Sequence, residues 1–363
     1  MVPVRTLQPR DTLCRVVIIA IVTAFSLTTF SYILFGNIDG RVGCPTWLIF
    51  MTNYSKPMCS VSGYYDSKTQ HARRLLIFYD MEQRLNGSSA RPLCGAQPAT
   101  LIGRRNISLV VRSDQNILAD NPLVQNGGAY RPSRCEPRHS FRLAVIVAFR
   151  DRQQHLQILL NNLHPFLQRQ QLEYTIFVVE QAGNATFNRG KLFNVGFREA
   201  EKFFAYSCLV FHDVDLLPEN DGNSYSCPQE PTLLCSAIEK FKYLPLPDHH
   251  LGGVVSFSSQ HFRQVNGFPN LYWGWGGEDD DLSQRVRARI GKLRRAPLDV
   301  GQYTMIKHAR DTGNPINPQR FTMVGTAAKR FATDGLSSLS YTVIKLQLKP
   351  LYTWILVDIG QPI

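Results

Sequence analysis

Two patterns of apolar residues alternate through the middle of the chain. Residues 142–149 (RLAVIVAF) form an unbroken apolar run of strand length, and leucines then recur every three or four positions over residues 156–167, as in a helix. A second run, residues 174–179, precedes a helical pattern over roughly residues 189–204, and a third covers residues 208–212. This alternation predicts an α/β fold with a largely parallel sheet covered by helices.

Charged residues directly follow two of these predicted strands. Residues 150–152 (RDR) come after the first strand and residues 213–215 (DVD) after the third. Ligands bind beyond the carboxyl ends of parallel strands, so both groups are expected at a binding site. Successive side chains of an extended chain point to opposite sides, which leaves one of the two aspartates free to hold a hard cation. Asp-x-Asp also ends many strands as ordinary turn chemistry, so this pattern alone leaves both interpretations open.

The segment of residues 272–281 (YWGWGGEDDD) combines aromatic residues, glycines and four consecutive acids. Glycine lets the backbone approach a sugar closely, and tryptophan offers a flat apolar face to the sugar's C–H surface. Four adjacent carboxylates repel one another unless cations, donors or a helix N-terminus compensate. Apolar residues spaced by four predict a helix from near Asp279 onward (Leu282, Val286 and Ile290). A solvated acidic helix start is the alternative for Asp280 and Asp281.

A methionine and a histidine lie three residues apart, at Met305 and His308. Alone, such a pair is more often a core residue and an ordinary surface histidine. Together with a carboxylate, the thioether and the imidazole form a mixed oxygen, nitrogen and sulfur donor set. That set favours a first-row metal such as manganese over calcium.

The first part of the chain predicts a membrane anchor. Residues 16–35 carry no charge, and at about 1.5 Å per helical residue they are long enough to cross the roughly 30 Å hydrocarbon core. Arginines precede this run at positions 5, 10 and 15, and the first charge after it is Asp39. The positive-inside rule therefore predicts a cytosolic N-terminus and a lumenal remainder, which is type II topology. A cleaved signal peptide is the alternative, although this run exceeds the usual length of its apolar core.

Residues 36–93 mix Gly, Ser, Tyr and Lys without sustained periodicity, which suits a stem that holds a catalytic part away from the membrane. We therefore expect a cytoplasmic tail (1–15), a transmembrane signal anchor (16–35), a lumenal stem (36–93) and one catalytic domain (94–363).

Charge, sequons and cysteines agree with this arrangement. The net charge of +12 and the pI near 9.4 raise the question of nucleic acid, but Lys and Arg are scattered and the lumenal topology speaks against a nucleic-acid enzyme. An acidic substrate such as a nucleotide diphosphate fits the charge equally well. The eight cysteines include no C-x-x-C pair, which argues against a structural zinc. Lumenal sequons of the form N-x-S/T would be usable at Asn53, Asn86, Asn106 and Asn184.

Six short motifs together closely resemble the β-1,4-galactosyltransferase family. They occur in the family's order and with its spacing across residues 94–363, at 149–152 (FRDR), 187–189 (FNR), 213–215 (DVD), 273–281 (WGWGGEDDD), 305–311 (MIKHARD) and 317–321 (NPQRF). The resemblance implies the glycosyltransferase-A fold, in which a nucleotide-binding α/β domain is joined to acceptor-binding elements. It also implies a Golgi enzyme that transfers galactose from UDP-galactose to N-acetylglucosamine (GlcNAc) at the end of a glycan, with Mn²⁺.

Residue roles carry over from the same resemblance. The implied Mn²⁺ ligands are Asp215, Met305 and His308, and the implied catalytic base is Asp279, which accepts the proton of the acceptor 4-hydroxyl so that an α-linked donor gives a β-linked product. The implied donor-binding residues are Ala148, Phe149, Arg150, Asp151, Arg152, Phe187, Asn188, Arg189, Val214, Asp215, Trp275, His308, Ala309, Arg310 and Asp311. The implied acceptor-binding residues are His250, Gly277, Glu278, Asp279, Asp280, Arg320 and Phe321.

Some expectations stay open at this point. His250 stands where galactose-transferring relatives carry Tyr and where an aliphatic residue accompanies N-acetylgalactosamine transfer, so UDP-N-acetylgalactosamine is the alternative donor. An inactive glycan-binding homologue is the rival from another class. The resemblance pairs Cys94 with Cys135 and Cys208 with Cys227. The sequence leaves Cys235 as a candidate buried free thiol, and it does not decide whether Cys44 pairs with Cys59 or whether the protein forms a homodimer.

Overall fold

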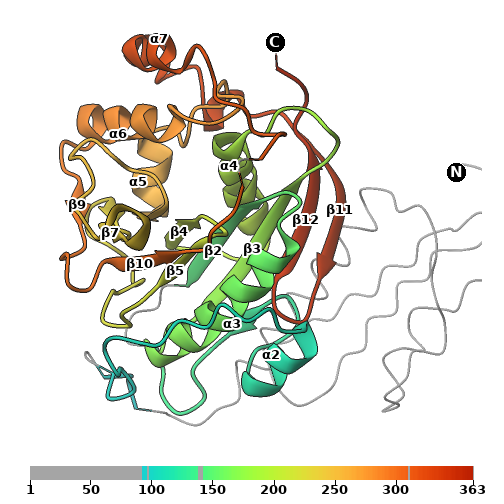
Figure 1. The fold of residues 1–363 in the computed structure, drawn as a ribbon, viewed down its shortest axis with the longest axis vertical. Helices are drawn as coiled ribbons and strands as arrows, with labels where there is room; N and C mark the ends of the chain where they lie inside the picture. Colours follow the sequence, from blue (N-terminus) through green and yellow to red (C-terminus); the bar gives the residue numbers. More distant parts are fainter. Residues whose placement is uncertain (1–91, 96–97, 138–141, 310, 363) are drawn as a thin grey trace, which may run out of the picture. The chain divides into compact units, whose positions relative to one another are not determined.

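The computed structural model describes residues 92–95, 98–137, 142–309 and 311–362, all within one compact unit of the chain (Figure 1). The expected tail and anchor and nearly all of the expected stem lie outside these residues, as do Cys14, Cys44, Cys59, Arg310 and the sequons at Asn53 and Asn86. Within the part of the chain that is described, no helix has the length and apolar character needed to cross a membrane.

A twisted sheet forms the centre of the fold (Figure 1). Its strand order is β11-β12-β3-β2-β4-β8-β6-β9, with β1 paired to the start of β3. The bounds are β1 Ala129–Tyr130, β2 Leu143–Phe149, β3 Tyr174–Gln181, β4 Cys208–His212, β6 Thr232–Leu233, β8 Val254–Ser258, β9 Arg294–Arg295, β11 Thr342–Leu348 and β12 Thr353–Asp358. The three strands predicted from the apolar runs are β2, β3 and β4, and all three are confirmed.

The sheet is parallel at its centre and antiparallel toward both sides. Strands β12, β3, β2 and β4 are parallel, whereas β11 is antiparallel to β12 and β8 is antiparallel to both β4 and β6. The prediction of a largely parallel sheet is therefore correct for the centre and wrong for the flanks. Strands β11 and β12 are joined by the short connection of residues 349–352, which reverses the chain without the crossover helix that a parallel pair needs. Strand β8 instead reaches β4 after the long segment of residues 213–253.

The helices are α2 Asp114–Asp120, α3 Gln153–Arg169, α4 Arg189–Ala200, α5 Ser259–Gln264, α6 Glu278–Arg289 and α7 Arg320–Gly325, with 3₁₀ turns at Glu239–Phe241, Ala327–Arg330 and Leu336–Ser338. The α3 prediction is confirmed. Helix α4 ends at Ala200, short of the predicted residue 204. Phe203 and Phe204 are buried but follow the helix in a turn, and their apolar side chains continue the sequence pattern of the helix beyond its end.

The order of the strands creates the place for a binding site. The chain steps from β2 to β3 on one side and then from β3 across to β4 on the other side of β2. Because such crossovers are right-handed, α3 and α4 cover opposite faces of the sheet. In folds with this strand order the ligand-binding crevice forms beyond the carboxyl ends of the strands, here β2 and β4. Helix α4 packs tightly here, since a Cβ at Gly196 would lie 2.3 Å from the Ile146 side chain.

A second, three-stranded sheet lies beside this crevice. It has the order β5-β10-β7, where β5 is Leu216–Pro218, β7 is Ala237–Ile238 and β10 is Gln302–Met305. Strand β5 begins directly after residues 213–215, and β10 ends at Met305. Their antiparallel pairing places Met305 opposite Leu216, so this small sheet joins two motifs that are far apart in the sequence.

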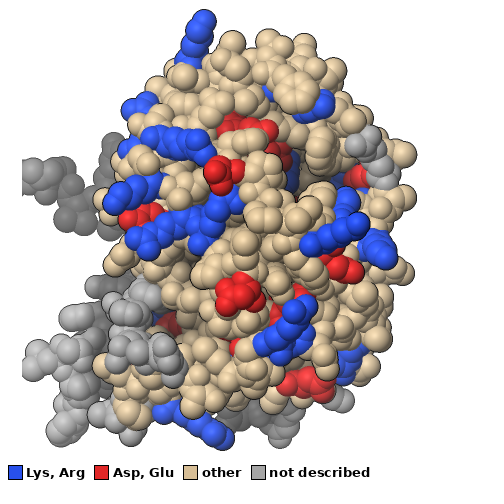
Figure 2. All heavy atoms as spheres, turned by 60° about the vertical axis from the view of Figure 1, so that its left-hand side comes forward, with Lys and Arg blue, Asp and Glu red and all other residues tan. Residues whose placement is uncertain are grey.

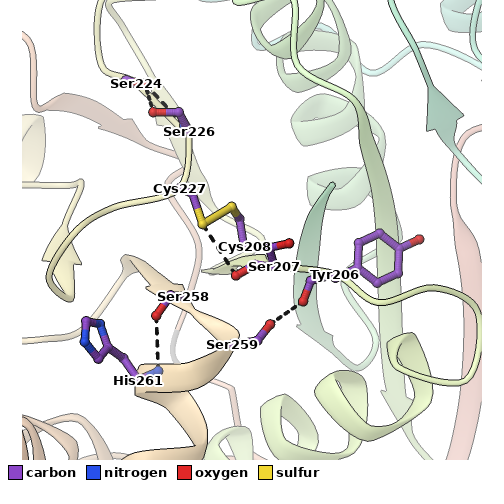
Figure 3. The surroundings of a disulfide bond; sticks show 9 residues. All are labelled: Tyr206, Ser207, Cys208, Ser224, Ser226, Cys227, Ser258, Ser259 and His261. Carbon is purple, nitrogen blue, oxygen red and sulfur yellow. Dashed lines mark hydrogen bonds between the residues drawn. A yellow bond between two sulfur atoms is a disulfide. The ribbon is translucent and has the colours of Figure 1, made fainter. Parts of the chain in front are cut away.

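Two disulfides are formed within the described part of the chain, Cys94–Cys135 and Cys208–Cys227, as the family resemblance implies. The second ties the loop before β6 to the first residue of β4, next to the junction of β8 and α5 (Figure 3). Cys235 is a buried free thiol that contacts the backbone on both sides of Gly253, accepting from Val254 N and donating to the Gly252 carbonyl. Burial raises the pKa of this thiol to about 12, which suits an inert core residue.

Candidate active site

The two aspartates at the end of β4 have different partners. Asp213 accepts a 2.6 Å hydrogen bond from Arg189 Nε, at the first residue of α4. Burial raises the pKa of Asp213 to about 6, although Arg189 opposes the rise. Asp215 instead faces the small second sheet. Of the two carboxylates in residues 213–215, Asp215 is therefore the one available to hold a cation.

Asp215 meets His308 and Met305 through the pairing of β5 with β10. The Asp215 carbonyl accepts a 2.8 Å hydrogen bond from Ile306 N, directly after Met305. His308 Nε2 then lies 3.0 Å from Asp215 Oδ2, and its Nδ1 lies 2.7 Å from the Ala309 carbonyl. The hydrogen bond to Asp215 raises the pKa of His308. Both ring nitrogens therefore face an oxygen, Nδ1 the Ala309 carbonyl and Nε2 the Asp215 carboxylate. With the Nδ1 proton held by Ala309, loss of the Nε2 proton would leave a lone pair on the Asp215 side for a metal.

The donor atoms at this place fit a manganese ion. The Asp215 carboxylate and the His308 imidazole nitrogen lie together, and the half-buried Met305, whose neighbour Ile306 bonds to the Asp215 backbone, would complete the mixed set that suits a first-row metal. Among the described residues, no three His, Cys, Asp or Glu side chains are grouped so as to hold a metal. A metal here would therefore take its remaining ligands from outside this set of side chains, as a phosphate oxygen or water provides.

Arg150 contacts the backbone of two loops that carry expected donor-binding residues. Its guanidinium donates to the carbonyls of Ala185 and Gly313, at 2.6 and 2.8 Å, and lies 5.2 Å from the centre of the Phe187 ring. The Phe187 amide donates to the same Gly313 carbonyl. Arg150 is 8% exposed, so the structure gives it the task of joining the segment before α4 to the segment after His308.

Other residues that were expected to bind the donor lie at the end of β2 and at the starts of α3 and α4. Ala148 and Phe149 are the buried last residues of β2. Asp151 is exposed with a left-handed φ of 51°, and Arg152 precedes α3 with its guanidinium 4.0 Å from Asp311. Asn188 is fully buried, caps α4 by accepting from Lys191 N, and donates to the Asn270 carbonyl. Its position is explained by folding alone.

Arg189 joins the aspartates of β4 to helix α6. Besides its bond to Asp213, its Nη1 lies 3.2 Å from Glu278 Oε1, and its guanidinium lies over the Phe193 ring. Burial raises the pKa of Glu278 to about 7, with the Asp279 charge as a second cause. One buried cation thus holds a carboxyl from each of two elements that the sequence separates widely.

The four acids open α6, as predicted. Gly277 stands before the helix with φ of 99°, and a Cβ there would lie 2.7 Å from the Tyr272 ring, so glycine is required twice over. Glu278, Asp279 and Asp280 occupy the first turn, where the helix dipole favours negative charge. Asp279 Oδ1 accepts from the Asp280 amide.

The fourth acid is not solvated. Asp281 is fully buried, with Arg285 Nε at 2.6 Å and the Tyr272 hydroxyl at 3.0 Å. The alternative of a solvated helix start is therefore wrong for Asp281, and Asp280 is half-buried. Arg285, also fully buried, donates to the Asp334 carbonyl. This buried pair fixes the helix that carries Asp279.

Exposed aromatic side chains lie beside the start of α6. Trp275 is 55% exposed and Phe321 is 74% exposed, and the Arg320 guanidinium lies 6.0 and 4.3 Å from the centres of their rings. The Trp275 backbone is held in place by hydrogen bonds with Pro315 and Asn317. The tryptophan backbone is therefore fixed while its ring stays open to solvent.

Three residues near the site were not predicted from the sequence. His155, in the first turn of α3, has its ring 5.6 Å from that of His308, edge to face. Gly252 lies against Asp279, and Arg295 donates to the His250 carbonyl. His155 follows the RDR motif by one helical turn, a spacing that would have indicated it. Gly252 and Arg295 carry no comparable signal.

Charged residues are spread over the surface, as their scattered positions in the sequence indicate. Figure 2 shows Lys and Arg distributed over the displayed face with Asp and Glu among them. The sequons that fall within the described ranges, Asn106 and Asn184, are both exposed.

Comparison with known proteins decides the family. Residues 94–228 match the family model described as the N-terminal region of glycosyl transferase group 7, and residues 233–309 match that of the N-terminal domain of galactosyltransferase. The chain is 50% identical over 272 residues to β-1,4-galactosyltransferase 3 of Bos taurus, covering 74% of this chain and 68% of that protein. It is 46% identical over 272 residues to human β-1,4-galactosyltransferase 1, covering 75% and 68%. The chain belongs to the β-1,4-galactosyltransferase family.

Solved structures agree with this membership. The catalytic domain of Drosophila β-1,4-galactosyltransferase 7, solved with xylobiose, aligns with a TM-score of 0.52 at 29% identity, over 61% of this chain and 94% of that one. A mutant of the same Drosophila enzyme, solved with manganese, UDP-Gal and xylobiose, aligns equally well. The fold is thus that of a glycosyltransferase-A galactosyltransferase, as the motifs predict.

Proposed function

We propose that this chain transfers galactose from UDP-α-galactose to the 4-hydroxyl of a terminal GlcNAc, with inversion at the anomeric carbon, to form a β-1,4 linkage on glycoprotein or glycolipid glycans. The observation that carries the proposal is the meeting of the Asp215–His308 pair and the Asp279 helix at the carboxyl ends of the central strands. Membership of the β-1,4-galactosyltransferase family supports it, as does the neighbouring structure that contains UDP-Gal.

Asp215, Met305 and His308 are the residues that would hold Mn²⁺. When bound, the metal supplies Lewis-acid charge next to the diphosphate leaving group. The chain's own contribution is to fix the donor atoms. The Asp215 backbone is held through its carbonyl and the His308 ring through its Nδ1. The two side chains would then exchange their mutual contact for the metal.

The donor nucleotide would lie in the crevice beyond β2. Arg150 and Phe187 would shape its floor, with Arg152, Val214 and Asp311 around it. Asp151, Asn188, Arg189, Ala309 and Arg310 complete the proposed donor group, and Ala148 and Phe149 form its buried edge. Trp275 would cover the donor, since its ring is exposed beside the site.

Asp279 would act as the general base. It lies in the first turn of α6, where the dipole stabilises its charged form. Its carboxylate accepts the acceptor proton as the 4-hydroxyl oxygen bonds to the anomeric carbon and UDP leaves with the electron pair. Gly277, Glu278, Asp280 and His250 would surround the GlcNAc ring, and Arg320 with Phe321 would contact its N-acetyl group.

The choice of donor sugar tests the proposal. His250 is neither the Tyr of galactose-transferring relatives nor an aliphatic residue, so N-acetylgalactosamine is the second candidate. A panel of UDP-galactose, UDP-N-acetylgalactosamine and UDP-glucose is compared with Mn²⁺, on free GlcNAc and on a GlcNAc-ended glycan. We expect the highest kcat/KM with UDP-galactose. Turnover near zero with every donor would favour the inactive glycan-binding homologue.

The placement of the enzyme belongs to the same proposal. It would be a single-pass type II protein of the Golgi membrane with a lumenal catalytic domain at residues 94–363, behind a stem, anchor and tail at 36–93, 16–35 and 1–15. Use of the sequons at Asn106 and Asn184 would follow from that topology, as would use of Asn53 and Asn86. Whether two copies associate is a separate measurement, made by sedimentation of the full-length chain.

A further inference from the structure

Asp279 has a histidine neighbour from another part of the chain. His250 Nδ1 lies 3.7 Å from Asp279 Oδ2. His250 belongs to the loop before β8, whereas Asp279 belongs to the first turn of α6. The two side chains are 29% and 18% exposed, so water reaches both groups while the protein partly desolvates them. At this distance a single water or a small rotation of the imidazole completes a hydrogen bond.

The backbone at Gly252 makes this approach possible. A Cβ at that position would lie 2.3 Å from Asp279 Oδ2 and 2.9 Å from His250 Cε1. Any larger residue would therefore occupy the space in which the carboxylate and the imidazole face each other. The glycine itself is held through its carbonyl, which accepts from Cys235 Sγ.

Two arginines bond to the backbone of the loop that carries His250. Arg295 donates to the carbonyls of Leu246 and His250, at 3.0 and 3.3 Å, and Arg287 donates to the carbonyl of Asp248 at 2.7 Å. These bonds all go to backbone atoms. The position of His250 is therefore set by the loop, and its imidazole remains available for Asp279.

The charged groups around His250 come from four directions. Asp279 faces it from α6, Arg189 from α4 and Arg295 from β9, and His249 precedes it in the loop. Burial, the two arginines and His249 lower the pKa of His250, and Asp279 opposes them. The imidazole is consequently neutral in neutral solution and gives up an acquired proton readily.

Resting on the proposed function, we propose that His250 is a positioning residue that carries the proton from Asp279 to solvent after each sugar transfer. In the transfer step the acceptor O–H bond breaks and its proton passes to the Asp279 carboxylate. The Asp279 O–H bond then breaks, the proton passes to His250 Nδ1, and the imidazolium releases a proton from Nε2 to water. The Asp279 carboxylate is restored and one proton has entered the solvent, while the imidazole is left with its proton on Nδ1. Exchange with water, which reaches the 29% exposed imidazole, returns that proton to Nε2 before the next cycle.

The relay predicts an acid limb in the pH profile. Below the pKa of His250 the imidazolium forms before substrate reacts, and its charge pairs with the Asp279 carboxylate and weakens it as a base. Above that pKa the neutral imidazole accepts the proton. Activity therefore rises with pH through the titration of His250.

The test compares His250→Gln with His249→Gln, the matched change at the neighbouring, exposed histidine. For H250Q we expect kcat at pH 7 to fall about tenfold, the acid limb to move, and added free imidazole to restore part of the rate. Mn²⁺-dependent UDP binding, measured by calorimetry, should stay within about twofold of wild type, because the contacts of His250 described above, with Asp279 and Arg295, do not involve the proposed metal residues. H249Q should keep its acid limb, displaced to higher pH because His249 no longer lowers the pKa of His250, and should keep its kcat above that limb and gain nothing from imidazole.

Two outcomes separate the two proposals. A wild-type enzyme without turnover at any pH overturns the proposed function. An active wild-type enzyme whose pH profile is unchanged in H250Q, with no imidazole rescue, overturns the relay alone. If H250Q does not fold, His250→Tyr supplies the same comparison, because the phenol is also an aromatic ring and cannot accept a proton in neutral solution.

Discussion

Arg189 Nε donates a 2.6 Å hydrogen bond to Asp213 Oδ1, and this contact separates the roles of the two aspartates in the DVD motif. Asp213 is committed to a buried arginine, and Asp215 is left for His308. The same arginine reaches Glu278 at the start of α6. Arg189 therefore links the end of β4, where the donor is proposed to bind, to the start of α6, where the acceptor is proposed to bind.

Replacing this arginine should disturb both sides together. Arg189→Ala leaves the carboxyls of Asp213 and Glu278, which are 29% and 11% exposed, without their shared cation. Partial exposure lowers the cost below the roughly 3–5 kcal/mol of a fully buried pair. We expect a loss of thermal stability together with a higher KM for both substrates. Exposed Arg289→Ala, at the far end of α6, is the control. An Arg189→Ala enzyme with wild-type melting and an altered KM for only one substrate would contradict the shared role.

Removal of the proposed base should separate chemistry from binding. Asp279→Asn keeps the shape of the first turn of α6 and removes proton acceptance, so kcat should fall by about 10² to 10⁴. UDP binding with Mn²⁺, measured by calorimetry, should stay close to wild type. Loss of binding along with turnover would assign Asp279 a structural task instead.

The thioether should control metal choice. Met305→Ala removes the soft donor and leaves Asp215 and His308, so the preference for Mn²⁺ over Mg²⁺ should narrow. The measurement is kcat/KM across a metal series, with Met323→Ala as a control for methionine loss elsewhere. An unchanged metal series would remove Met305 from the site.

The buried carboxyl of Glu278 should make stability depend on pH. Its pKa rises from 4.5 to about 7 on folding, so the folded state binds the proton more tightly than the unfolded state. Stability from this group is present below about pH 4.5 and is lost as the pH rises toward 7. Glu278→Gln removes that slope, so its melting temperature relative to wild type should be higher at pH 8 than at pH 5. An equal difference at both pH values would contradict the raised pKa, and exposed Glu239→Gln is the control.

The second disulfide should contribute measurably to stability. Cys208 and Cys227 close a loop with a sequence separation of 19, for which the chain-entropy estimate is about 3 kcal/mol. Cys208→Ala with Cys227→Ala should lower the midpoint of urea unfolding accordingly. Cys235→Ala, which leaves both bridges intact, distinguishes the loss of a cross-link from the loss of a cysteine.

The central strands could be predicted because each is buried on both faces. An unbroken apolar run such as that of β2 has few explanations other than such a strand. Strand β11 alternates between half-buried and exposed residues, and β12 finds its partner in β3, far away in the sequence. Local pattern contains no information on such long-range pairing.

The site was predictable in kind and not in detail. The acids, the Met305–His308 spacing and the strand ends indicated a metal and a sugar. Which aspartate stays free depends on Arg189, and the burial of Asp281 depends on Arg285. The commitment of Arg150 to two backbone carbonyls is likewise a property of the folded chain. Side-chain partnerships of this sort follow from three-dimensional contact, which residue types alone do not specify.

Strand β12 has a consequence for how the protein is made. It is the last described element of the chain, yet it lies inside the sheet between β11 and β3. During synthesis β3 is made well before β12. Its edge therefore stays unpaired until residues 353–358 are available to pair with it. An open strand edge invites pairing with other chains. A premature stop between Phe321 and Thr353 would therefore produce an aggregating chain that still contains every proposed catalytic residue.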